Sequence, residues 1–162
     1  MEISDLTKRF SDSYENQCKA IFASVFIVGN RLQTIFDNNI PEISLKQFML
    51  LIMIRQSEES LTFTRLGKLL GCSRQNIKKL AASLEQKGFV VLKKSEKDVR
   101  AVNICPTEKM EDYFEEVFSV YQKDLQYLFE GYSQEEVKQL FHLMMKLYDG
   151  TENLERRIKE NE

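Results

Sequence analysis

Apolar residues recur along most of the chain with the period of a helix. Residues 11–38 contain few helix-breaking residues and carry a broad apolar pattern, which predicts a long helix buried on more than one side. A helix of that kind usually packs against a partner. Pro41 is expected to end it, because proline lacks an amide hydrogen and disfavours helix at the preceding residue. The apolar positions are Ile21, Phe22, Val25, Phe26, Val28, Leu32, Ile35 and Phe36.

Three shorter helices are predicted between residues 44 and 88, each opened by a residue whose side chain caps free amides. The last of them has apolar positions at the spacing of one helix face: Ile77, Leu80, Ala81 and Leu84. Glycine is expected to close two of these helices, since it readily takes the left-handed conformation. The expected N-caps are Ser44, Thr62 or Thr64, and Ser73, and the expected closing glycines are Gly71 and Gly88.

Two short runs with strand character, 89–92 and 101–104, flank the charged segment 93–100 and predict a hairpin. Helical patterning returns after Pro106. Thr107 is expected to cap a helix that extends to about Gly131. Ser133 and Glu136 then form the pattern of a capping box, which opens a last helix reaching Tyr148 or beyond.

Two short helices joined by a glycine-bearing turn and followed by a basic hairpin are the layout of a winged helix-turn-helix. The predicted fold is mainly α with a small β-hairpin wing, flanked by N- and C-terminal dimerisation helices. We expect three parts, at residues 1–40, 41–106 and 107–162. The long flanking helices carry more apolar surface than they can bury alone, which predicts a two-fold homodimer.

Charge is distributed unevenly along the chain. The net charge of the whole chain is −2, yet residues 61–104 contain ten cations and three anions, Glu85, Glu96 and Asp98. One basic segment between acidic flanks is expected where a single module faces phosphate. A charge run alone is also compatible with an ordinary solvated face, so the positions of the cations matter.

The helix that begins after Ser73 is the candidate for reading bases. At about 100° per residue, its outward side carries Gln75, Lys78, Lys79 and Ala82. Glutamine can pair with adenine, and lysine can reach guanine or phosphate. The free amides at the helix start can seat a phosphate, and Arg100 is expected to enter a minor groove. The predicted DNA-binding residues are Ser73, Arg74, Gln75, Asn76, Lys78, Lys79, Lys93, Lys94, Lys97, Asp98 and Arg100.

Other classes of protein find little support. There is no glycine-rich phosphate loop and no Cys/His or Ser/His arrangement around the lone His142, so we expect no enzyme. Three separate cysteines predict reduced thiols, with neither a disulfide framework nor a metal or other cofactor. No apolar run approaches the roughly 20 residues of a membrane span, which predicts a cytoplasmic protein without membrane contact.

Three stretches resemble the MarR family and span about residues 30–110. The first is 44–54, and the second runs from Leu66 through the basic helix to the Leu-Glu-Gln-Lys-Gly-Phe-Val sequence at 84–90. The third joins Asp98-Val99-Arg100 to Pro106-Thr107-Glu108-Lys109. The chain departs from the family in lacking the glycine of Leu-Thr-x-x-Gly after the hairpin, and it carries Lys78-Lys79 where a Thr-Arg pair is usual. These departures leave the expected fold intact, but the operator sequence that the chain recognises does not follow from the resemblance.

The resemblance implies a homodimer with intertwined terminal helices that binds a pseudo-palindromic operator in double-stranded DNA and represses transcription. It also implies release by a small lipophilic or aromatic effector, for which Phe26, Phe36, Phe48 and Met53 are candidates, although each of them taken singly fits a core position better. A peroxide-sensing branch of the family uses a cysteine near tyrosines in the N-terminal helix. That branch makes redox sensing by Cys18, beside Tyr14, one alternative. A winged helix that binds protein is another.

Overall fold

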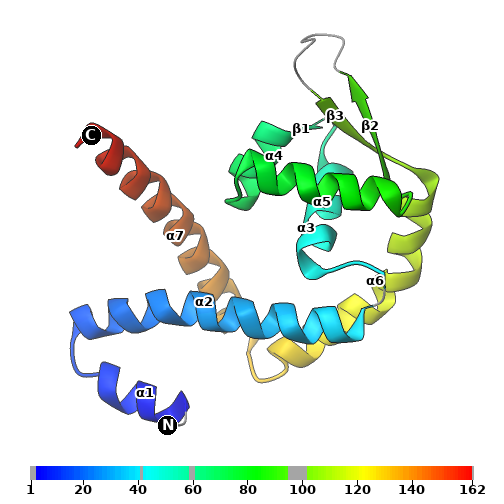
Figure 1. Ribbon diagram of the computed structural model, residues 1–162. Coiled ribbons are helices and arrows are strands. Elements are labelled where there is room, and N and C mark those ends of the chain that lie inside the picture. The colour runs from blue at the N-terminus through cyan, green and yellow to red at the C-terminus, as the bar shows by residue number, and fades with distance from the viewer. Residues whose placement is uncertain (1–2, 41, 59–60, 95–101, 162) are drawn as a thin grey trace. The chain divides into compact units, whose positions relative to one another are not determined.

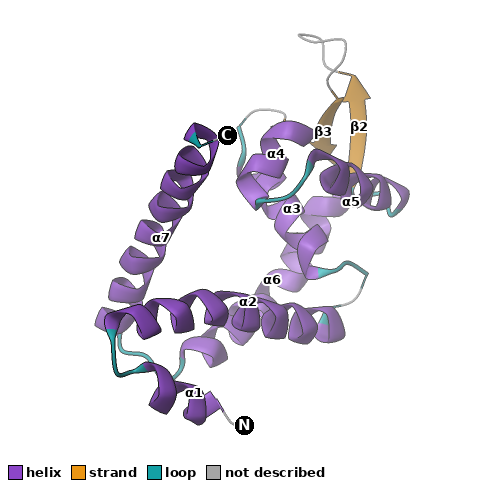
Figure 2. Cartoon of the chain, turned by 60° about the vertical axis from the view of Figure 1, so that its left-hand side comes forward, coloured by secondary structure: helices purple, strands orange, loops and turns teal. Residues whose placement is uncertain are grey.

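The structure is a computed structural model that describes residues 3–40, 42–58, 61–94 and 102–161 (Figure 1). Within these residues the chain is mainly helical with one small sheet, as the sequence predicts (Figure 2). The elements are α1 (Ile3–Phe10), α2 (Tyr14–Asn39), α3 (Leu45–Gln56), β1 (Leu61–Thr62), α4 (Phe63–Leu70), α5 (Arg74–Gln86), β2 (Val90–Lys94), β3 (Val102–Pro106), α6 (Glu108–Phe129) and α7 (Gln134–Glu160).

Two compact units make up the chain, Met1–Phe114 and Glu115–Glu162. The first unit holds the hydrophobic core, to which α3, α4, α5, the sheet and the first turns of α6 all contribute. Its largest fully buried side chains are Phe89, Leu50, Leu51, Leu66, Ile77, Leu84, Ile104, Met110 and Val90. The core therefore lies directly behind α5, the helix that the sequence assigns to base reading.

The sheet is antiparallel and has the strand order β1-β3-β2. The hairpin predicted from the sequence is formed by β2 and β3, with Leu92 opposite Ile104 and Lys94 opposite Val102. β1 was not predicted, because a strand of two residues has no readable period. It pairs Leu61 with Ile104, so that β3 is the central strand and β2 is an edge strand.

Local capping chemistry accounts for most helix boundaries in the first unit. The Ser44 hydroxyl accepts from the Gln47 amide at 3.4 Å, and the Gln47 side chain returns to the Ser44 amide at 3.0 Å, which completes a capping box. Thr62, rather than Thr64, caps α4. The predicted glycines also close helices, with φ of 63° at Gly71 and 81° at Gly88.

Thr107 precedes α6 as expected, but its side chain does not act as the predicted cap. The hydroxyl lies 2.7 Å from the carbonyl oxygen of Gly88 and 2.9 Å from that of Phe89, to which it donates. The hydroxyl is therefore shared between two carbonyls at the turn from α5 to β2, and the Phe89 carbonyl also accepts from the Thr107 amide at 3.2 Å. Thr107 ties the start of α6 to that turn.

The N-terminal region differs from the single predicted helix. Residues 3–39 form two helices, because Ser13 adopts an extended conformation and caps α2 through the Asn16 amide at 3.2 Å. Pro41, expected to end the long helix, lies outside the described residues; α2 ends at Asn39 with Ile40 extended. The broad apolar face is exposed in the single chain, and α2 contains no buried residue. Its exposed apolar side chains include Ile21, Phe22, Val25, Phe26, Ile27, Val28 and Ile35.

In the second unit, α7 begins at the predicted capping box. The Ser133 amide donates to the Glu136 carboxylate at 2.8 Å, and the Ser133 hydroxyl accepts from the Glu136 amide at 3.3 Å. The amide first, and then the Ser133 hydroxyl, lower the pKa of Glu136. The helix continues to Glu160, past Tyr148, and exposes an apolar series of its own: Val137, Leu140, Phe141, Leu143, Met144, Met145, Leu147, Tyr148, Leu154 and Ile158.

Candidate nucleic-acid interface

The turn between α4 and α5 sets the position at which α5 begins. The Cys72 amide donates to the carbonyl of Gly67 at 2.8 Å, across Gly71 in the left-handed conformation. The carbonyl oxygen of Cys72 lies so close to Gly67 that a Cβ built there would be 2.6 Å from it. Ser73 then caps α5 by accepting from the Asn76 amide at 3.2 Å. Ser73 is exposed, so the start of α5 is accessible to an anion.

The two sides of α5 differ sharply in burial. Ile77, Ala81 and Leu84 have no exposed surface. The predicted outward residues Gln75, Lys78, Lys79 and Ala82 are all exposed, as are Arg74 and Asn76 beside them. Burial of the inner side fixes the rotation of the helix about its axis, so these polar side chains share one solvent-facing surface.

No carboxylate of the described residues pairs with the cations of this surface. The ion pairs of the described residues lie elsewhere, at Lys19–Glu15, Arg55–Glu111, Lys109–Glu42 and Lys138–Glu135. Lys78 and Lys79 are exposed, and no carboxylate of the described residues offsets their charge. A surface of this kind is suited to neutralising phosphates.

The wing adds two further cations. Lys93 and Lys94 are exposed at the end of β2, the strand that follows α5 directly. The hairpin tip, with the predicted residues Lys97, Asp98 and Arg100, lies outside the described residues. The α5 and β2 members of the predicted site are therefore exposed on two elements that pack against each other.

The end of α5 is held by polar contacts that the sequence analysis did not assign. The Phe89 amide donates to the Leu84 carbonyl at 3.0 Å and the Gly88 amide to Glu85 at 2.9 Å, which is a Schellman motif. Lys87 Nζ donates to the backbone carbonyl of Glu42, in the loop before α3, and to Gln47 Oε1 at 3.3 Å. Lys87 and Gly88, which belong to the Leu-Glu-Gln-Lys-Gly-Phe-Val sequence at 84–90, therefore have structural roles.

Gln47 links α3 to α5 from within the core. It is the one buried polar residue among the described residues, with 6% of its surface exposed. Its Nε2 donates to Ser83 Oγ at 3.0 Å, while its Oε1 accepts from the Ser44 amide and from Lys87. The Ser-x-x-Gln spacing at residues 44–47 signals the capping box in the sequence. Nothing local signals the contact with Ser83, 36 residues away.

Lys109 adds a contact from the start of α6. Its Nζ donates to the carbonyl of Lys87 at 3.1 Å, pairs with the Glu42 carboxylate at 3.2 Å, and lies 4.5 Å from the centre of the Phe89 ring. α6 is thereby tied to the end of the candidate recognition helix. Burial first, and the nearby Glu42 charge second, raise the pKa of Tyr113 in the next turn of α6 to about 12.

The four candidate effector residues separate into two groups. Phe36 and Phe48 have ring centres 5.0 Å apart, and Phe48 lies 5.5 Å from Phe114, so these rings form one aromatic cluster. Phe26 is 60% exposed on α2, where it contacts Phe22 at 5.2 Å. Met53 is half-buried in α3.

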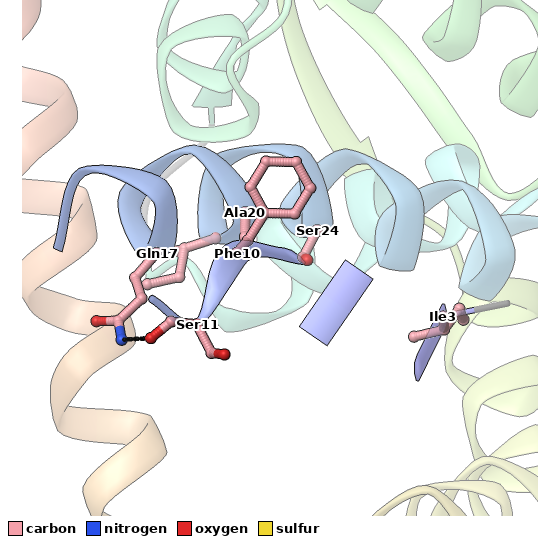
Figure 3. A pocket seen from close by; sticks show the side chains of 7 residues that line it. Ile3, Phe10, Ser11, Gln17, Ala20 and Ser24 are labelled. Carbon is pink, nitrogen blue, oxygen red and sulfur yellow. Dashed lines mark hydrogen bonds between the residues drawn. The ribbon is translucent and has the colours of Figure 1, made fainter. Parts of the chain in front are cut away.

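A shallow hollow lies between α1 and α2, away from the four candidate effector residues (Figure 3). Two of its lining residues are joined by a hydrogen bond, in which Gln17 Nε2 donates to the Ser11 carbonyl at 3.1 Å. The residues that line it are Ile3, Phe10, Ser11, Gln17, Ala20, Ile21 and Ser24.

The cysteines occupy different environments. Cys18 is exposed on α2, and a hydrogen bond with its side chain raises the pKa of Tyr14. Cys72 and Cys105 are half-buried, and the Cys72 thiol donates to the Leu70 carbonyl at 3.5 Å. In the part of the chain that the structure describes, no three His, Cys, Asp or Glu residues gather as metal ligands. None of the described helices has the length and apolar character needed to span a bilayer.

Comparison with known proteins identifies the arrangement. A family model described as MarR family matches residues 42–101, the helix-turn-helix and the wing. The transcriptional repressor MprA of Escherichia coli K12 is 30% identical over 109 residues, 67% of this chain. The match spans 62% of that relative's own length.

Solved structures share the fold. A cysteine-to-serine mutant of MarR from E. coli, complexed with operator DNA, superposes with a TM-score of 0.72 at 22% identity and covers 84% of this chain and 99% of that one. The MepR–DNA complex of S. aureus gives 0.71 at 20% identity, covering 80% and 97%. At these identities the likeness establishes the fold alone. Taken with the family model and the repressor relative, it means that the chain belongs to the MarR family of winged helix-turn-helix transcription regulators, which is not a family of enzymes.

Proposed function

We propose that this chain is a sequence-specific, DNA-binding transcription regulator that acts in the cytoplasm as a homodimer. In this proposal it represses transcription by binding a pseudo-palindromic operator and responds to a small ligand. The observation that carries the proposal is the exposed cationic side of α5, with Lys78 and Lys79 unpaired by any described carboxylate and continued by Lys93 and Lys94 on β2. Such a surface favours binding to a polyanion, because its lysines neutralise phosphates and release the counterions around them.

In the proposed complex α5 enters the major groove. Gln75 lies in the first turn of α5, where it can pair with adenine, and Ala82 is small enough to let the helix approach the bases. Ser73, Arg74 and the first amides of α5 hold a phosphate. The wing lysines neutralise the flanking backbone, and Arg100 at the wing tip enters the minor groove.

Two relatives support duplex DNA as the partner, since the MarR and MepR structures are both complexes with DNA, the former with operator DNA. The repressor relative MprA supports negative regulation. Exposed apolar faces on α2 and α7 support the homodimer, because isolated apolar faces of that size are rare in monomers. We assign residues 1–40 and 107–162 to dimerisation and 41–106 to DNA binding.

For the ligand we propose a lipophilic or aromatic molecule bound beside the aromatic cluster of Phe36 and Phe48, with Phe26 and Met53 reached in the dimer. The ring-to-ring contact of 5.0 Å between α2 and α3 supports this site, since a ligand that separates these helices would shift the support of α5.

The first experiment selects binding sites from random duplexes with the intact protein. We expect an inverted repeat with half-sites about one DNA turn apart, roughly 10 base pairs. Gln75→Ala is expected to change the base preference, whereas Arg100→Ala is expected to weaken binding to all selected sites. Enrichment of no duplex would contradict the proposal.

A salt titration then separates phosphate contact from protein recognition. Lys79→Ala is expected to lower DNA affinity and to reduce the salt dependence by about one unit of slope, as for one phosphate that the protein no longer neutralises. Lys159→Ala, at an exposed position near the end of α7, is the control and should leave both quantities unchanged. Affinity that is insensitive to salt would favour the winged helix as a protein-binding module.

Cys18 supports a second candidate function, regulation by oxidants. Its thiol is exposed, and its proximity raises the pKa of Tyr14. If this function holds, a thiol-reactive reagent reduces operator binding by the wild-type protein but not by Cys18→Ser. Unchanged binding after complete labelling of Cys18 would dismiss it.

A further inference from the structure

Glu85 carries a negative charge at a position where the surrounding structure disfavours one. It is the only acidic residue among residues 61–94 and 102–104, the described part of the basic segment. It lies in the last turn of α5, where the negative end of the helix dipole destabilises a carboxylate. A negative charge beside a phosphate-binding surface also opposes DNA. We therefore expect the Glu85 carboxylate to make a specific interaction that offsets these costs.

The contact that Glu85 makes is with the wing. Its Oε1 accepts a hydrogen bond from the backbone amide of Leu92 at 2.9 Å. Among the described residues β2 pairs with β3 on one side only, and no strand pairs along its other edge. A charged acceptor makes the bond shorter and stronger than one to a neutral group. Glu85 thus closes the free edge of β2 against α5.

The position of this bond determines what it controls. Leu92 directly precedes Lys93 and Lys94, the described cations of the wing, while Glu85 shares α5 with Lys78 and Lys79. β2 also follows α5 through the turn at Gly88, after which Phe89 and Val90 are buried in the core. The bond to Leu92 is a polar link farther along the strand, closer to the wing lysines.

We propose that Glu85 is a positioning residue for DNA binding, which holds the base of the wing at a fixed place relative to α5. This inference rests on the proposed function. With the bond in place, the two sets of lysines meet the duplex in one prearranged geometry. Without it, the strand edge is solvated and the wing must be ordered when DNA binds, which weakens the complex.

Two neutral variants of similar size test the role, because both remove the charge and one keeps the acceptor. Glu85→Gln is expected to bind the selected operator at least as tightly as the wild type, since its amide oxygen still accepts from Leu92 and a repulsive charge is gone. Glu85→Met is expected to bind about tenfold more weakly, as for loss of one hydrogen bond to a charged group. If Glu85 were only a surface charge, both variants would bind more tightly by the same factor.

Amide exchange supplies a readout that needs no DNA. The Leu92 amide should exchange slowly in the wild type and in Glu85→Gln, and at least about tenfold faster in Glu85→Met. Gln86→Met, at the exposed neighbouring position, is the control for the added methionine and should alter neither exchange nor affinity. Methionine has a helix propensity close to that of glutamate, so α5 is expected to remain folded.

The outcomes separate the two proposals. Equal operator affinities for Glu85→Gln and Glu85→Met, in a protein whose wild type binds DNA, would overturn the role of Glu85 and leave the proposed function standing. A wild type that binds no duplex, with Leu92 still protected, would overturn the proposed function and this inference with it.

Discussion

Gly67 lies in α4 against the turn that leads into α5, and a Cβ at this position would be 2.6 Å from the carbonyl oxygen of Cys72. That oxygen belongs to the backbone, so it cannot move aside without shifting the turn. Gly67→Ala is therefore expected to lower the free energy of unfolding by about 1–3 kcal/mol, measured by urea denaturation. Operator affinity should fall as well, because the start of α5 moves with the turn.

The matched control is Gly150→Ala, in the middle of α7, where a Cβ has nothing within 4 Å. Alanine restricts the unfolded chain and favours helix, so this variant should gain about 0.5–1 kcal/mol. A similar change in stability for both variants would show that the close approach at Gly67 imposes no constraint.

Tyr113 makes stability depend on alkaline pH. Its folded pKa of about 12 lies above the ordinary value of 10, because burial, and then the charge of Glu42, disfavour the phenolate. The resulting stability is fully present below pH 10 and is lost as pH rises from 10 to 12, by up to about 2–3 kcal/mol. Tyr113→Phe cannot ionise, so its unfolding free energy should fall less steeply over that window. Tyr127→Phe, which alters a ring 62% exposed, should retain the steep fall.

At the scale of elements, α3 supports α5 through Gln47. Replacement by leucine keeps the volume but leaves Ser83, the Ser44 amide and Lys87 without this partner. Gln47→Leu is therefore expected to cost about 2 kcal/mol of unfolding free energy. Gln56→Leu, at the exposed end of α3, should stay within about 0.5 kcal/mol of the wild type.

A double-mutant cycle isolates the link between the two helices. Ser83→Ala combined with Gln47→Leu should cost less than the sum of the single changes, because either one alone already breaks the Nε2–Oγ bond. Strict additivity would mean that the buried amide stabilises α3 alone and does not hold α5.

The elements differ in how far the sequence could predict them. Ser44, Ser73 and Ser133 cap helices as expected, because a cap depends on residues three positions away. The outward side of α5 was predicted for a similar local reason, the periodic burial of Ile77, Ala81 and Leu84. β1 and the break before α2 were missed, since neither has a hydrophobic period of its own.

Within the site, the contacts between different elements could not be predicted from the sequence. Glu85 was counted only as a charge, and its partner Leu92 lies past a turn whose geometry the sequence does not specify. Thr107 was expected to cap α6, but the carbonyls of Gly88 and Phe89 take its hydroxyl. In each case a distant backbone group decides what the side chain does.

At the scale of the whole molecule, the exposed face of α2 leads to a prediction about assembly. Phe26 is 60% exposed and meets Phe22, itself 69% exposed, edge to face. Burying such rings between two copies would stabilise a dimer by about 1.5–3 kcal/mol for each ring. Phe26→Glu places a charge in that interface, and it is expected to shift the protein from dimer to monomer in light scattering.

The same variant tests whether dimerisation determines the affinity for DNA. A monomer presents one α5 to one half-site, so Phe26→Glu should lose most affinity for the full inverted repeat while keeping its weak binding to a half-site duplex. Arg31→Glu places the same side chain at an exposed polar position of α2, about 140° around the helix from Phe26, and should remain a dimer that binds the full repeat. A Phe26→Glu protein that stays dimeric would place the two-fold contact elsewhere, with the exposed apolar series of α7 as the next surface to alter.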